Sequence, residues 1–209
     1  MADFPKPFPT PSSPAIASFN WTDIADNTGI RAFYLAQSTN SVDTEYTLSN
    51  SATTSDPKLW QKQNQGVSGT KTLNFDSTGF QNPQEIGGIV RFSFTHGTNN
   101  TTGSGTNNVQ VKLYTYDGSS ETQIGASATS PDAYTTADGV IRSNERLLQI
   151  EIPRTIIQRD EQLRVKVLIT YTGAAGNVWQ YLWTDPMNNT LDSGNTTAFT
   201  VFIPFKIDL

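Results

Sequence analysis

The chain has 209 residues, enough for one domain with a sizeable core, and 11% of them are aromatic. It contains no cysteine and one histidine, which excludes disulfides, thiolate chemistry and metal sites built from several such ligands. The net charge of −5 argues against a nucleic-acid-binding protein, whose contact face is basic. Only 16% of the residues are charged, and the abundant Thr, Ser and Asn predict a polar, largely uncharged surface.

Hydropathy along the chain gives no sign of export or of membrane insertion. No apolar run of signal-peptide length follows the N-terminus, and no stretch approaches the roughly 18 apolar residues that cross a bilayer. We therefore expect synthesis in the cytoplasm without a signal peptide, and no membrane partner.

The first fifteen residues form a proline-rich segment. Its candidate partner-binding residues are Phe4, Pro5, Pro7, Phe8, Pro9 and Pro11. Prolines at alternate positions fix φ and remove donors, which predicts an extended, polyproline-like arm. Two interpretations stay open: a loose tail, or a docking arm whose two Phe rings anchor it on a neighbouring subunit or another partner.

From residue 16 onward the sequence is typical of strands separated by turn clusters. The predicted strands cover residues 30–36, 44–49, 71–75, 89–95, 109–114, 121–125, 147–152, 163–171, 177–183 and 198–207. Residues 50–70 and 97–108, rich in Ser, Thr, Asn and Gly, are predicted as long exposed connections. Asp117-Gly118 predicts a tight hairpin turn.

The pattern within these strands predicts two packed layers. Val90, Phe92 and Phe94 alternate with polar residues, as expected of a half-buried strand. Pro153 is expected to end the strand before it, and Pro204 indicates an edge strand or a bulge. The predicted fold class is all-β: one antiparallel, jelly-roll-like β-sandwich over residues 16–209, preceded by the arm.

His96 is the single candidate for histidine-dependent catalysis. No Gly-x-Ser-x-Gly motif surrounds any serine, so we expect a strand-end histidine with an ordinary hydrogen bond. A glycoside hydrolase would need two carboxylates about 5–10 Å apart. Six acidic residues are candidates: Glu85, Glu121, Glu145, Glu151, Asp160 and Glu161. No motif brings any two together, so we predict no catalytic residue and no enzyme.

We also predict no cofactor. A structural calcium ion stays open, because calcium binds carboxylate and amide oxygens and Asp23 and Asp26 form an acidic pair in a turn. Aspartates in turns more often accept hydrogen bonds from their own backbone, which is the simpler interpretation here.

The aromatic residues suggest two contact regions. Trp179, Tyr181 and Trp183 fall on one face of their strand, with Gln180 on the other. A buried stripe in the middle of the core, with Gln180 facing solvent, is favoured over an exposed platform that stacks on sugars. Trp60 lies in a polar loop and needs a groove or a partner. These four aromatic residues are candidates for an interface or a glycan contact.

A cysteine-free, Thr- and Asn-rich β domain preceded by Phe4-Pro5-Lys6-Pro7-Phe8-Pro9 resembles the small structural proteins of tailed bacteriophages and related viruses. These include capsid decoration, head-fibre and tail-associated proteins, many of them oligomeric sandwiches. The resemblance implies a virion protein that assembles with itself, as a trimer, and with other virion proteins. It is one of overall character, so it assigns no site residue.

Two other functions stay open beside the virion protein. The first is a carbohydrate-binding or host-receptor-binding module, which would need exposed aromatic residues in a shallow groove. The second is a glycoside or polysaccharide hydrolase, which would need a convergent carboxylate pair.

Overall fold

The computed structural model describes residues 17–18, 28–39, 44–52, 59–65, 68–100, 105–135, 140–173, 177–187 and 198–206. The proline-rich arm, Asp23 and Asp26 lie outside these residues. The described strands are β1 (Ala17–Ser18), β2 (Thr28–Thr39), β3 (Thr44–Ser49), β4 (Leu59–Gln65), β5 (Gly69–Asp76), β6 (Gln84–Asn100), β7 (Gly105–Tyr116), β8 (Glu121–Thr129), β9 (Ala133–Thr135), β10 (Arg142–Ile157), β11 (Gln162–Gly173), β12 (Asn177–Trp183) and β13 (Phe199–Lys206).

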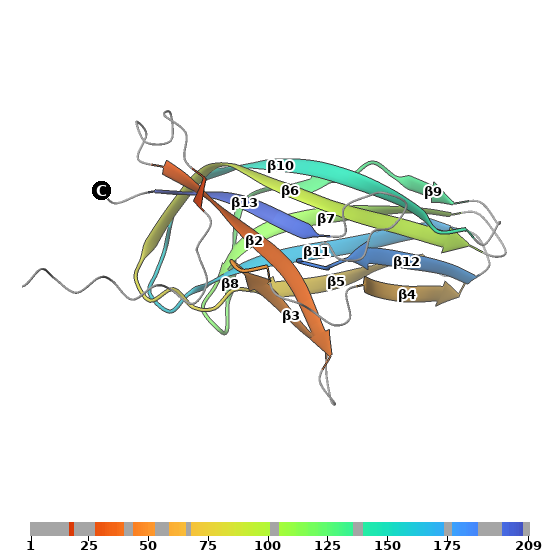
Figure 1. Ribbon diagram of the computed structural model, residues 1–209, viewed down its shortest axis with the longest axis horizontal. Helices are drawn as coiled ribbons and strands as arrows, with labels where there is room; N and C mark the ends of the chain where they lie inside the picture. The colour runs from red at the N-terminus through yellow and green to blue at the C-terminus, as the bar shows by residue number, and fades with distance from the viewer. Residues whose placement is uncertain are drawn as a thin grey trace, which may run out of the picture.

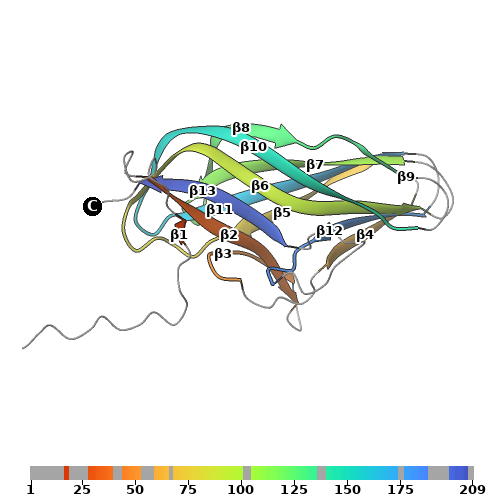
Figure 2. The same ribbon diagram turned by 45° about the horizontal axis from the view of Figure 1, so that its top comes forward.

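The strands form two layers that run along the long axis of the molecule (Figure 1). The first layer has the order β10-β6-β13-β2-β3, and β12 and β4 extend it beside the C-terminal end of β6. The second has the order β5-β11-β7-β8, with β9 beside the start of β7. Figure 2 shows β10, β6, β13 and β2 in front of β7, β11 and β5.

Almost all pairings between the described strands are antiparallel. The exception is a single parallel bridge, Thr47 of β3 to Asp76 of β5, which joins the two layers along one side. The chain is therefore an antiparallel, jelly-roll-like β-sandwich, and the predicted fold class is confirmed. The structure describes no helix long and apolar enough to cross a membrane.

The core lies between the layers and follows the predicted alternation. Val90, Phe92 and Phe94 of β6 are fully buried, as are Val165 and Val167 of the facing β11. The ring of Phe94 stacks on Phe199 of β13 at 4.7 Å between centroids. The core is rich in residues that branch at Cβ and in aromatic rings, which suit a pleated surface.

The predicted hairpin turn joins β7 and β8. Gly118 has a φ of 95°, which explains why glycine is needed there. The carboxylate of Asp117 accepts hydrogen bonds from the backbone N–H groups of Ser119 and Ser120 at 2.8 and 2.6 Å. These bonds lower the pKa of Asp117 below its ordinary value, because they stabilise the charged form.

Both strand prolines lie at register shifts. The prediction that Pro153 ends its strand was wrong, because β10 continues to Ile157 with a shift between Ile152 and Thr155. Among the described strands β10 pairs with β6 alone, and a bulge on such an edge accommodates a residue without an N–H. Pro204 follows the bulge alternative, since the pairing of β13 with β6 shifts between Phe202 and Phe205.

Both predicted long loops contain strands. Residues 50–70 include β4, which pairs with β12 over its whole length although its sequence shows no hydrophobic alternation. Residues 97–108 include the end of β6 and the start of β7, and Thr98 and Asn107 are buried there. In both places the pairing with a neighbouring strand, and not the local pattern, decides the structure.

Candidate functional site

The aromatic residues of β12 are largely buried. Tyr181 and Trp183 are 7% and 4% exposed, and Trp179 is half-buried. The interpretation as a buried stripe is right that Tyr181 and Trp183 are buried, so they offer no open platform to a sugar ring. It was wrong to place them in the middle of the core, because they lie on the other face of the sheet. Trp60 lies on β4, paired with Leu182, and its side chain lies outside the described residues. The candidate contacts of the arm, residues 4–11, also lie outside them.

The placement of Gln180 on the solvent face was wrong. Gln180 pairs with Thr98 and Leu182 with His96, so Gln180 and Leu182 share the face of β6 that forms the core. Gln180 is fully buried, and neither atom of its amide has a hydrogen-bond partner among the described groups. The aromatic residues therefore occupy the outer face, where a Cβ on Gly97 would lie 3.0 Å from the Trp183 ring.

His96 is also not at the end of its strand. It lies within β6, is fully buried, and neither ring nitrogen meets hydrogen-bond geometry with a described group. Burial lowers the pKa of His96 to about 4, the charge of Arg146 lowers it further, and the amide of Asn107 opposes the shift. The imidazole is neutral near pH 7 and has no surface from which it could contact a substrate.

Two of the candidate carboxylates are held by pairs of cations. Glu85 lies 2.6 Å from Arg154 and 3.9 Å from Lys206. Glu121 pairs with Lys166 and with Arg164, the latter at 3.2 Å, and these bonds lower the pKa of Glu121. Both groups are therefore ionised near neutral pH, which suits ion pairing and not proton donation.

The other acidic candidates take ordinary surface positions. Glu151 is exposed, as the alternation predicts. The carboxylate of Glu161 accepts a hydrogen bond from the backbone N–H of Gln158 at 2.7 Å, as expected of a turn residue. Within the described part of the chain, no group of three or more His, Asp or Glu side chains could hold a metal ion.

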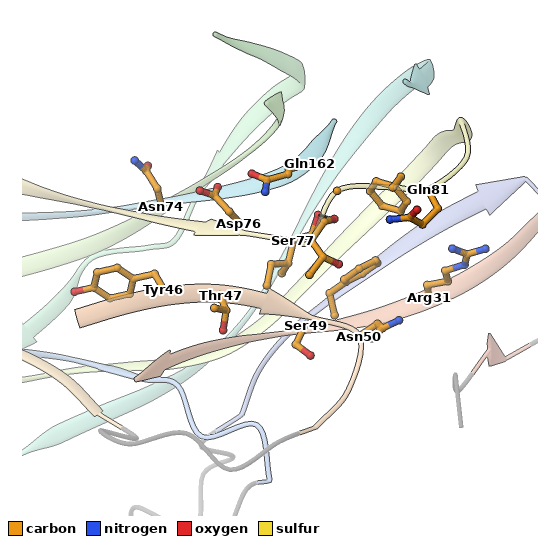
Figure 3. A pocket seen from close by; sticks show the side chains of 15 residues that line it. Arg31, Tyr46, Thr47, Ser49, Asn50, Asn74, Asp76, Ser77, Gln81 and Gln162 are labelled. Atoms are coloured by element: carbon orange, nitrogen blue, oxygen red, sulfur yellow. Dashed lines mark hydrogen bonds between the residues drawn. The ribbon is translucent and has the colours of Figure 1, made fainter. Parts of the chain in front are cut away.

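The described residues line a groove of about 930 Å³ at one side of the sandwich. We call it the seam groove, because it lies beside the single bridge between β3 and β5. Figure 3 shows its side chains, which come from β2, β3, β5, the residues after β5, and the start of β11. The lining includes Arg31, Phe33, Tyr46, Asn74, Phe80, Gln81 and Gln162.

One wall of the seam groove is held by backbone hydrogen bonds. Residues 77–80 follow β5 and lie against the turn that precedes β11. The N–H of Ser77 donates to Leu163, and the N–H of Phe80 donates to Glu161 at 3.0 Å. The Ser77 hydroxyl also accepts from the N–H of Leu163 at 2.9 Å. The wall is thus formed before any ligand arrives.

The groove combines aromatic surface with uncommitted amides. Tyr46 packs edge-on against Phe75, and Phe80 lies against Phe205 deeper in the fold. The side chains of Asn74, Gln81 and Gln162 make no hydrogen bond to any described group, and they line the groove (Figure 3). Amides both donate and accept, so these groups suit hydroxyls or backbone carbonyls as partners.

The two charged residues of the groove differ in their partners. Asp76 receives a bidentate pair from Arg164, at 2.6 and 2.7 Å, and that guanidinium lies over the Tyr116 ring. Arg31 lies over the ring of Phe205 at 4.3 Å and has no carboxylate within 4.0 Å among the described residues. Partial burial lowers the pKa of Arg31, which nevertheless keeps its charge. Arg31 is the group in the groove best placed to receive an anion.

The sequence did not single out the seam groove. Its residues come from segments as far apart as Arg31 and Gln162, and none belongs to a motif. Tyr46 carried a weak signal, as an aromatic residue in a short alternating strand, but such residues are usually part of the core. Only the meeting of β3 and β5 brings these side chains together.

No family model and no curated protein matches the chain. Similar solved structures include an α-amino acid ester hydrolase, with a TM-score of 0.55 and 10% identity, covering 84% of this chain and 36% of that one. An aminopeptidase from a marine sediment Thaumarchaeota archaeon has a TM-score of 0.54 and 7% identity, covering 84% and 37%.

A CocE/NonD family hydrolase from Staphylococcus aureus has a TM-score of 0.51 and 11% identity, covering 86% of this chain and 37% of that one. The chain therefore spans little more than a third of these proteins. At such low identity the likeness is one of fold alone.

Proposed function

We propose that the chain is a non-enzymatic structural protein of a virus particle, a capsid decoration or tail-associated component. It assembles with copies of itself, as a trimer, and with other virion proteins through sandwich contacts and the proline-rich arm. The observation that carries the proposal is the position of β1. Ala17, next to the arm, pairs with Arg31, which lines the seam groove.

The chemistry of the described residues supports a binding role over a catalytic one. His96 is enclosed by the core, and Glu85 and Glu121 are each held by two cations. The seam groove offers aromatic faces and amides, which bind partners without breaking bonds. The low charge of the chain lets protein surfaces approach one another without a large Coulomb cost.

Deletion of residues 1–15 tests this function. Light scattering should give about three times 22.9 kDa for the full chain and a monomer for the shortened one, because the arm holds the subunits together. The matched control replaces residues 1–15 by a Gly/Ser segment of equal length and should also be monomeric. Equal masses for the full and shortened chains would contradict an assembly role for the arm.

A second candidate function is glycan binding in the seam groove. The observation that favours it is the combination of Tyr46 with the amides of Asn74 and Gln81, a common setting for sugar rings and hydroxyls. Under this function the groove would face outward on the assembled particle and contact a surface glycan of the host.

A glycan array followed by titration calorimetry tests the second candidate. A glycan that binds should lose about fivefold in affinity with Asn74→Ala, because one hydrogen bond to a ligand is worth about 1 kcal/mol. Gln149→Ala, on exposed β10, is the matched control and should bind normally. If no glycan on the array binds, the glycan function is contradicted, and the assembly function is not affected.

A further inference from the structure

We propose that the seam groove of one copy binds residues 4–11 of the arm of a neighbouring copy. The inference rests on the proposed assembly function and names the surface that receives the arm. It draws on the length of the groove, its chemistry, the position of Arg31 and the place where the arm joins the fold.

The lengths of groove and segment agree. Arg31 and Tyr46 lie at its two ends in Figure 3, and Tyr46 pairs with Gln37, six residues along β2 from Arg31. Six residues of a strand span about 20 Å. Residues 4–11 in a polyproline helix span about 22 Å, at a rise of 3.1 Å per residue. The segment can therefore lie along the whole groove.

The lining has the chemistry that recognises proline-rich peptides. Such peptides dock in grooves lined by aromatic rings, and their carbonyls accept hydrogen bonds because proline has no N–H to satisfy them internally. Tyr46 and Phe80 supply the rings, and Asn74, Gln81 and Gln162 supply N–H donors that are not already used by described groups. The rings of Phe4 and Phe8 add apolar area that a polar loop would lack.

Charge gives the segment a direction. Arg31 has no carboxylate within 4.0 Å among the described residues, and it marks one end of the groove. The arm carries one acidic residue, Asp3, directly before Phe4. An ion pair between Asp3 of one copy and Arg31 of the next would place the start of the segment at the Arg31 end.

The position of β1 points to a neighbouring copy as the source of the segment. Ala17 lies opposite Arg31, so the arm joins the fold at one end of its own groove. Ala17 lies nine positions after Phe8, which is about 28 Å in an extended chain. In the extended conformation that the prolines predict, both Phe rings would lie beyond the 20 Å of their own groove and within reach of another subunit.

A cysteine crosslink tests the proposal, since the chain has no cysteine of its own. The double variant Lys6→Cys/Asn74→Cys places one thiol in the arm and one on the exposed Asn74 of the groove. It is treated with a short bismaleimide and separated on a denaturing gel. The matched control is Lys6→Cys/Gln149→Cys, whose second thiol lies on exposed β10. Lys6→Cys/Gln81→Cys repeats the test if the Asn74 variant does not fold.

We expect crosslinked dimers and trimers at least about tenfold more abundant than in the control, because a docked arm has an effective concentration in the millimolar range. Adducts at the control level, or bridges found only within single chains, would overturn the proposal. Light scattering separates the two failures. If the oligomer requires the arm but no crosslink to the groove forms, the groove proposal fails and the assembly function stands. If the mass is the same with and without the arm, the assembly function fails as well.

Discussion

Gly125→Ala should lower the free energy of unfolding by about 3 kcal/mol, the sum of backbone strain and overpacking. Gly125 lies in β8 with a φ of 73°, a conformation that alanine adopts only at a cost. Its Cβ would lie 2.6 Å from the carbonyl oxygen of Glu151 and 3.0 Å from Cγ2 of Ile152. Both atoms belong to β10, so the two strands would have to separate.

Gly118→Ala is the matched control for this substitution. Gly118 also has a positive φ, 95°, but a Cβ there would meet nothing within 4 Å. It carries the strain without the clash, so we expect a loss of about 1 kcal/mol. Urea denaturation of both variants measures the difference. Equal losses would contradict the close packing of β8 against β10.

Acidification from pH 6.5 to 4 should remove about 3 kcal/mol of stability through His96. Its pKa is about 4 in the folded protein and 6.5 in the unfolded chain. Between these values the unfolded state takes up a proton that the folded state does not. The folded state is therefore most favoured above pH 6.5 and loses about 1.4 kcal/mol per pH unit on the way down. Below pH 4 this loss levels off.

His96→Leu isolates this effect. Leucine continues the apolar face of Val90, Phe92 and Phe94 and removes two ring nitrogens that have no described partner. Glu85 and Glu121, whose pKa values are lowered, also lose stability in acid, but they do so in both proteins. The measurement is the difference in urea stability between the wild type and the variant at pH 7 and pH 4.5. A difference that does not change with pH would show that His96 takes up its proton as readily in the folded protein as in the unfolded chain.

The strands that could be predicted were those whose pattern the core enforces. Phe92 and Val165 alternate with polar residues because one face of each strand is buried. β4 could not be found this way, because its Gln-rich sequence is held by pairing with β12. The prediction at Pro153 failed for a related reason. Proline has no N–H to donate to a neighbouring strand, but β10 has one described neighbour and a bulge there, so the strand continues past Pro153.

The seam groove and the position of Gln180 were less predictable than the fold. Gln180 was predicted to face solvent because amide side chains usually do. Its pairing with Thr98 shows that its side chain lies on the core face of the sheet. The seam groove depends on the bridge from Thr47 of β3 to Asp76 of β5, while β3 stays paired with β2. Such a meeting is a property of the topology, which alternation along one strand does not encode.

The interruption of β10 at Pro153 also bears on how copies of this chain avoid fibres. β10 is 16 residues long, and β8 packs against it at Glu151 and Ile152. An unbroken edge beyond that contact would be a template for a strand from another molecule. The shift between Ile152 and Thr155 divides it into two shorter ladders with different registers. A strand from another molecule that pairs with one half of β10 could not continue in register along the other half. Edge-to-edge association would therefore form few hydrogen bonds.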